Sequence, residues 1–165
     1  MDLVVLAGLQ GSGKTTFYRA RFAETHAHVS KDLFRHNHDK TRRQRHLVEA
    51  AAADGLSVVV DNTSVRREDR ADLVALARAL GMRPVLYWFP PDPKASLARN
   101  AGREGKARVS RVAIFATLKR LAPPAADEGF EEVYEVLAGG GGVFTVRPRP
   151  DLAAAAAAPP PAPTP

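Results

Sequence analysis

The residues that decide the fold are 3–15, which read LVVLAGLQGSGKT. The first five are apolar and predict a strand buried inside a sheet. The part from Gly8 to Thr15 fits the pattern G-x-x-x-x-G-K-[ST], in which a tight loop leads from a strand into a helix. Its glycines let several backbone N–H groups point to one place, beside the positive end of the helix, where a phosphate chain binds. This stretch therefore predicts a site for a nucleoside triphosphate.

The loop also assigns roles to single residues. Lys14 is expected to reach the β- and γ-phosphates of ATP as a catalytic residue, and the Thr15 hydroxyl is expected to bind Mg²⁺. The predicted ATP-binding residues of the loop are Gly11, Ser12, Gly13, Lys14, Thr15 and Thr16.

Composition narrows the choice of partners. The chain carries 24 Lys and Arg against 18 Asp and Glu, which gives a net charge of +6 and an isoelectric point near 10.1. Such an excess attracts polyanions such as nucleic acid or an anionic membrane surface, although a generally basic surface gives the same balance.

The absence of cysteine excludes disulfides, thiolate metal sites and cysteine nucleophiles. No apolar run approaches membrane-spanning length and a core strand begins at Leu3, so we expect no membrane association and a cytoplasmic location.

Strands and helices alternate along the 165 residues, which suffice for one domain. Strands are expected at 3–7, 27–29, 56–60 and 85–89, and a terminal hairpin at 132–137 and 143–147. A first helix runs from Lys14 to about Glu24, and later helices are expected to begin at the caps Asp39, Ser64, Asp92 and Ser110. The pattern predicts the α/β class: a three-layer P-loop kinase fold with a mainly parallel sheet flanked by helices. We place the folded domain at 1–150 and expect the Ala- and Pro-rich residues 151–165 to form a disordered tail.

Three polar clusters follow expected strands. They are Gly8–Thr15, Ser30–Arg35 and Asp61–Ser64. Because ligands of parallel sheets lie beyond the carboxyl ends of the strands, we expect these clusters to meet in one cleft.

The second cluster holds the candidate acceptor site. Asp32 is placed to act as a general base toward a substrate hydroxyl, and Arg35 to hold a phosphate of the acceptor. Asp32 has an alternative role in capping the turn or pairing with Lys31 or Arg35, and Arg35 has an alternative as a surface arginine.

Asp61, in the third cluster, is a candidate to hold Mg²⁺ through water. A helix-entry turn shared with Asn62 and Thr63 explains the same residues, and the two roles are compatible. The histidines lack the cysteine or carboxylate ligands that would complete a metal site with them. We therefore expect them to have their hydrogen bonds satisfied or to be exposed.

A basic, glycine-broken segment at about 99–110 is predicted to be a mobile lid. Such a segment closes over a triphosphate and places an arginine on the transferred phosphoryl group. The alternative is a solvated basic face, but only Glu104 supplies an acidic partner between Lys94 and Arg111. Arg99 and Arg103 are the candidate ATP contacts, and Arg103 is the candidate catalytic residue.

Residues 1–136 resemble the kinase module of polynucleotide 5′-kinases. The resemblance lies in the phosphate-binding loop together with SKDLFR at 30–35, VDNT at 60–63, RNxxR at 99–103, VS at 109–110 and EGF at 128–130. It implies that Asp32 is the base acting on a polynucleotide 5′-hydroxyl, that Arg35 grips the phosphate just 3′ of the terminal nucleoside, and that Arg103, helped by Arg99, contacts the donor phosphates. Members often carry a 3′-phosphatase or ligase domain, and no D-x-D-[GT] phosphatase motif occurs here, so a separate phosphatase or ligase partner is possible.

The expected function is therefore an ATP- and Mg²⁺-dependent polynucleotide 5′-hydroxyl kinase that acts on DNA or RNA ends. One alternative is a P-loop kinase for a different hydroxyl, such as an aminoacyl-tRNA, a sugar or a nucleotide-sugar. The other is a non-catalytic nucleotide-binding module that docks nucleic acid through its basic face.

Overall fold

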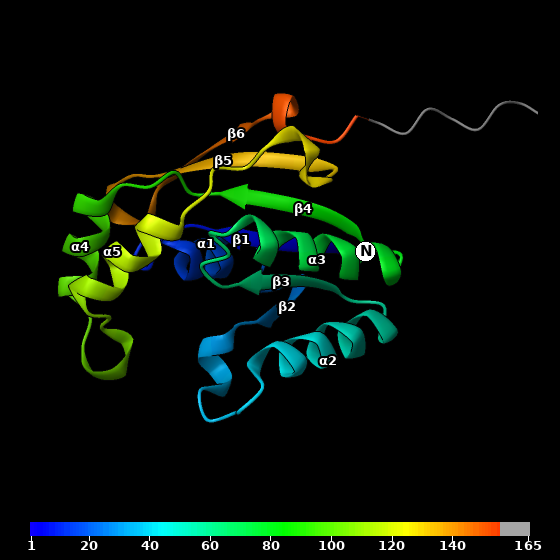
Figure 1. Cartoon of the computed structure of the whole chain (residues 1–165), viewed down its shortest axis with the longest axis horizontal. Coiled ribbons are helices and arrows are strands. Elements are labelled where there is room, and N and C mark those ends of the chain that lie inside the picture. The colour runs from blue at the N-terminus through cyan, green and yellow to red at the C-terminus, as the bar shows by residue number, and fades with distance from the viewer. Residues whose placement is uncertain (156–165) are drawn as a thin grey trace, which may run out of the picture.

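A single six-stranded sheet organises the computed structural model, which describes residues 1–155 (Figure 1). The strand order is β2-β3-β1-β4-β5-β6. The strands are β1 Asp2–Ala7, β2 His26–Val29, β3 Ser57–Asp61, β4 Arg83–Trp88, β5 Glu132–Ala138 and β6 Phe144–Pro148. The first five are parallel, and β6 runs antiparallel to β5. The predicted α/β class with a mainly parallel sheet is confirmed.

Helices cover both faces of this sheet. They are α1 Lys14–Arg21, α2 Lys40–Ala53, α3 Arg67–Ala79, α4 Pro93–Ala101 and α5 Arg111–Arg120. Along β1, Leu3 and Val5 pack with residues of α2 and α3, whereas Val4 and Leu6 pack with residues of α1. This alternation explains the continuous apolar run of β1, because a strand buried on both faces has no polar side.

The carboxyl ends of the parallel strands lie at one edge of the molecule. In Figure 1, β3 and β4 point toward α4 and α5, which stand beyond that edge. The loop between β1 and α1 and the turn after β2 also begin at this edge. The topology therefore brings the three polar clusters to one end of the sheet.

Three of the expected helix caps are confirmed. The side chains of Asp39, Asp92 and Ser110 accept backbone N–H bonds of 2.9, 3.0 and 3.1 Å at the starts of α2, α4 and α5. Each bond reaches only three residues along the chain, so sequence alone sufficed to find it.

Ser64 is not the cap of α3. Its φ is 43°, and α3 begins only at Arg67, behind Arg66, which makes no side-chain cap bond. The Ser64 carbonyl instead accepts a 3.2 Å bond from the buried Arg70 guanidinium. This contact ties the segment before α3 to the first turn of that helix.

The ends of the chain's elements also differ from expectation. Helix α1 stops at Arg21, three residues before Glu24. Contacts with the sheet extend past residue 150, where we expected the folded domain to end: the Ala154 N–H donates a 2.7 Å bond to the Phe130 carbonyl, and Leu152 packs against the core. The remaining part of the predicted tail, 156–165, lies outside the described residues. Within 1–155, no helix has the length and apolar character needed to cross a membrane.

Candidate nucleotide-binding and catalytic site

The loop between β1 and α1 is held open as a cradle by its glycines. Gly11 and Gly13 have φ values of 75° and 98°, a region that side chains rarely adopt. A methyl group at Gly11 would also lie 2.7 Å from the Ser96 carbonyl oxygen of α4. The Gly8 N–H donates a 2.8 Å bond to the Thr63 carbonyl, which ties the loop to the end of β3. The cradle fits the phosphate chain that the sequence predicts.

Lys14 lies at the floor of this cradle. Its buried ammonium donates to the carbonyls of Gly8 and Leu9 at 2.9 and 2.7 Å and to the Ser12 hydroxyl at 3.3 Å. Burial lowers the pKa of Lys14 to about 8; the negative charges of Asp61 and Asp32 oppose this shift, and the positive charge of Arg103 adds to it. A buried cation whose direct partners are neutral still attracts an anion strongly, and a phosphate would supply one.

Thr15 and Asp61 meet as the sequence predicts. The Thr15 hydroxyl donates a 2.7 Å bond to Asp61 Oδ2. Asp61 is buried, which tends to raise the pKa of its carboxyl, but hydrogen bonds from His28 and Thr15 and the charge of Lys14 hold that pKa below its ordinary value. An ionised carboxylate beside a hydroxyl offers the oxygen ligands that Mg²⁺ prefers, so both residues fit the predicted metal role.

His28 is a neighbour of this pair that sequence reasoning missed. Its Nε2 lies 3.1 Å from Asp61 Oδ2, and its ring stacks on Tyr18 of α1 at 3.9 Å with an interplanar angle of 12°. The stacking fixes the ring, and the ring in turn supports the Asp61 carboxylate. No local pattern predicts this contact, because it depends on how β2 lies against β3.

Asp32 lies on a 3-10 turn, Lys31–Phe34, directly after β2. The turn is held by two bonds: the Asp32 N–H donates to the Ser30 hydroxyl at 3.4 Å, and the Lys31 N–H donates to Asn62 Oδ1 at 2.9 Å. Asn62 is fixed in turn by a 2.6 Å bond from its Nδ2 to Gln44 of α2. The Asp32 carboxylate itself is exposed and pairs with no cation of residues 1–155, so the alternative of an ion pair with Lys31 or Arg35 is not realised.

Arg35 joins this turn to the basic segment 99–110. Its Nη1 donates a 2.9 Å bond to the Lys106 carbonyl and its Nε donates a 3.2 Å bond to the Asp32 carbonyl. These contacts leave its charge without a carboxylate partner among the described residues. The guanidinium therefore lies between the Asp32 turn and the lid as an available positive charge.

The two candidate arginines of the lid, Arg99 and Arg103, make different contacts. Arg99 Nη1 donates a 3.3 Å bond to the Gly11 carbonyl, so it contacts the cradle directly. Arg103 is half-buried and acts on Lys14 through its charge, without a side-chain hydrogen bond to another residue of 1–155. Asn100 closes the base of the lid by bonding both the carbonyl and the N–H of Val109. Thr16 is exposed on α1.

A small cavity of about 90 Å³ opens beside the cradle. It lies between the loop, the start of α4 and the end of β5, and its lining includes Ser12, Asp92, Arg99 and Ala138. Strand β6 lies close to this side of the loop through its first residue, Phe144. A methyl group added at Gly13 would lie only 3.3 Å from the Phe144 ring.

The family model of AAA domains named AAA_33 matches residues 3–124. The chain belongs to this AAA domain family. The matched part of the AAA domain holds the cradle, the Asp32 turn, Asp61 and the lid, whereas β5 and β6 lie beyond it.

Solved structures share the P-loop kinase fold of this AAA domain. A sugar kinase from Janibacter sp. HTCC2649 is 22% identical with a TM-score of 0.59, and the match covers 82% of this chain and 85% of that one. Kti12 from Chaetomium thermophilum, solved with ADP-AlF3, is 17% identical with a TM-score of 0.60 and coverages of 84% and 89%. A fungal RNA kinase is 13% identical with a TM-score of 0.63, and the match covers 82% of this chain but 38% of that one. At these identities the likeness shows the fold alone.

Proposed function

We propose that this AAA domain is an ATP-dependent kinase that phosphorylates the 5′-hydroxyl end of a polynucleotide. The observation that carries the proposal is the 3-10 turn after β2, where a carboxylate and a guanidinium lie three residues apart and neither forms an ion pair with another described residue. A polynucleotide end offers a hydroxyl and, one nucleoside away, a phosphate, and Asp32 and Arg35 match this pair chemically. A simple sugar offers the hydroxyl without the phosphate, so it gives Arg35 no partner.

We assign each group one role in the proposed reaction. Asp32 takes the proton of the 5′-hydroxyl as its oxygen bonds to the γ-phosphorus, while the bond from that phosphorus to the bridging oxygen of ADP breaks. Lys14, Arg99 and Arg103 stabilise the negative charge of the donor phosphates. Mg²⁺ would be held by Thr15 directly and by Asp61 through water, and it supplies further charge neutralisation when bound.

The test is phosphate transfer from labelled ATP to a panel of acceptors: 5′-OH DNA, 5′-OH RNA, aminoacyl-tRNA, sugars and a nucleotide-sugar. We expect product on the oligonucleotides. We expect Asp32→Asn to lower kcat at least about 100-fold while the ATP affinity changes less than about twofold, because only the proton acceptor is removed. Asp39→Asn, which alters the exposed cap of α2 on the same segment, is the matched control and should keep wild-type activity.

Two results would replace this proposal. Transfer to a sugar, an aminoacyl-tRNA or a nucleotide-sugar without transfer to oligonucleotides would assign a different acceptor to the same kinase site. Salt-dependent oligonucleotide binding without labelled product would favour a non-catalytic module.

A further inference from the structure

The outward face of α5 is apolar although it lies in solvent. Val112 and Phe115 are 77% and 40% exposed, whereas Ile114 and Thr117 on the opposite face are buried. The exposed pair lines a shallow, open hollow along α5 whose other lining residues are Arg111, Ala116 and Lys119. We call this surface the α5 hollow. Neighbouring apolar side chains exposed on one helix face are a candidate contact surface for a partner.

The charge around the α5 hollow has one sign. No Asp or Glu occurs between residues 105 and 126, a stretch that contains Lys106, Arg108, Arg111, Lys119 and Arg120. None of these five cations forms an ion pair with a carboxylate of the described residues. The occupant that this surface fits is therefore a polyanion that also carries flat apolar groups.

The α5 hollow is also linked along the chain to the proposed acceptor site. Arg35 bonds the Lys106 carbonyl, and α5 begins a few residues later at Arg111. On its inner side, α5 is fixed to the phosphate-binding loop by a 2.8 Å bond from Gln10 to Thr117. The helix therefore connects the cradle on one side with the hollow on the other.

We infer that the α5 hollow binds a single-stranded segment of the acceptor, 3′ of the end held by Asp32 and Arg35. A base stacks on Phe115, and Arg111 and Lys119 bind phosphates on either side of it. These two cations are eight residues apart, which corresponds to about 12 Å along a helix and leaves room for nucleotides between them. The inference rests on the proposed function, since it extends the track of the same substrate.

The experiment compares a 5′-OH 12-mer with a 5′-OH dinucleotide that ends in a 3′-phosphate, because only the longer acceptor reaches α5. By fluorescence anisotropy, Phe115→Ala should weaken binding of the 12-mer about 5- to 100-fold. The kcat/KM for the dinucleotide should stay within about twofold of wild type. Replacing Arg111 and Lys119 by alanine should make the plot of log K against log[salt] shallower by about 0.7 for each phosphate that the variant no longer neutralises.

Two control variants test whether a loss of 12-mer affinity is specific to the α5 hollow. They remove cations or an exposed apolar side chain elsewhere on the surface. Leu56→Ala truncates an exposed apolar residue at the opposite end of the sheet and should leave 12-mer binding unchanged. Arg42→Ala with Arg45→Ala removes two exposed cations from α2 and should lower the affinity less than the α5 double variant does.

The outcomes of this experiment also distinguish the two proposals. If Phe115→Ala binds the 12-mer with wild-type affinity, the inference is overturned and the kinase proposal stays intact. The same holds if the α2 double variant loses more affinity for the 12-mer than the α5 double variant does. If the protein self-associates, and Phe115→Ala abolishes this self-association but leaves the 12-mer affinity unchanged, the α5 hollow is a protein interface and the inference is overturned. Phe115-dependent binding of the 12-mer without phosphorylation of any oligonucleotide supports the hollow as a nucleic-acid site and refutes the kinase proposal.

Discussion

Lys14 is a buried cation, and its burial carries an electrostatic cost. The chain buries its ammonium among carbonyl and hydroxyl oxygens, and burial lowers its pKa to about 8 from an ordinary value of 10.5. Between these two pH values the unfolded chain binds the proton that the folded chain has released. Stability without nucleotide therefore rises with pH across this window, because the charged form is the costly one.

We expect this dependence to disappear in Lys14→Met. The free energy of unfolding of the wild type should gain up to about 3 kcal/mol relative to the variant between pH 7 and pH 10.5. Urea titrations at pH 7, 8.5 and 10 measure it. Lys94→Met, at an exposed position on α4, serves as the control and should follow the wild type. If the free energy of unfolding changes with pH in the same way in the wild type and in Lys14→Met, Lys14 is not the source of the pH dependence.

At the scale of elements, Asn62 connects three of them. It bonds the turn after β2 and Gln44 of α2 from its own position after β3, and so it sets where Asp32 stands. In Asn62→Ala, neither bond can form and the turn is free to shift. A shift of about 1 Å at a reacting group can lower a rate about 100-fold.

We therefore expect Asn62→Ala to lower kcat about 10- to 100-fold, while ATP affinity, measured by calorimetry, changes little. Asn37→Ala removes an exposed asparagine bond within the same loop and should act as wild type. If Asn62→Ala instead weakens ATP binding with kcat unchanged, its role lies in the cradle and not in the turn.

These elements also show how far the sequence could lead. The cradle, the caps Asp39, Asp92 and Ser110, and the pairing of β5 with β6 were predictable, because each depends on residues close in the chain. The contacts of His28, Asn62 and Arg35 were not, since they join segments whose register is set only when the sheet assembles. The prediction for Ser64 was wrong for a different reason: α3 begins only at Arg67, and the Ser64 carbonyl bonds Arg70 inside that helix, a contact that cap preference does not reveal.

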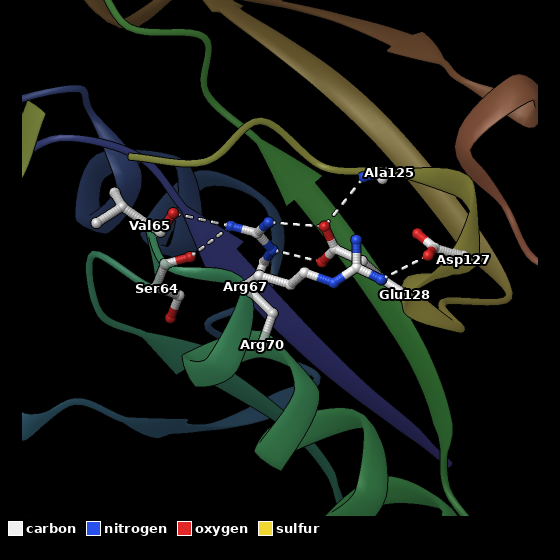
Figure 2. A network of polar contacts seen from close by, with 7 residues as sticks. All are labelled: Ser64, Val65, Arg67, Arg70, Ala125, Asp127 and Glu128. Carbon is white, nitrogen blue, oxygen red and sulfur yellow. Dashed lines mark hydrogen bonds and ion pairs between the residues drawn. The ribbon is translucent and has the colours of Figure 1, made fainter. Parts of the chain in front are cut away.

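At the scale of the whole molecule, a buried ion pair joins the two halves of the chain. Figure 2 shows Arg70 of α3 with its guanidinium against the Glu128 carboxylate, at 2.6 and 2.7 Å, and against the carbonyls of Ser64 and Val65. The side chains of Arg70 and Glu128 are 0% and 2% exposed. Glu128 also accepts a 3.0 Å bond from the Ala125 N–H, so this pair fixes the connection that leads into β5.

Removing one partner of such a pair leaves a buried charge uncompensated. We expect Arg70→Met to lower the free energy of unfolding by about 3–5 kcal/mol in urea titrations. Arg67, drawn in the same figure, pairs with Asp127 at 2.7 Å on the surface, and Arg67→Met should lower the stability much less than Arg70→Met does. Equal losses of stability in both variants would show that burial does not govern the strength of this ion pair.

The glycine-rich tip between β5 and β6 offers a route to observing nucleotide binding. An added methyl group at Gly140 would meet no atom within 4 Å, and the chain contains no natural cysteine. Gly140→Cys would thus introduce a single thiol for attaching a fluorophore. Because Phe144, four residues along, touches the loop at Gly13, such a dye would sit beside the phosphate cradle without altering any of its residues.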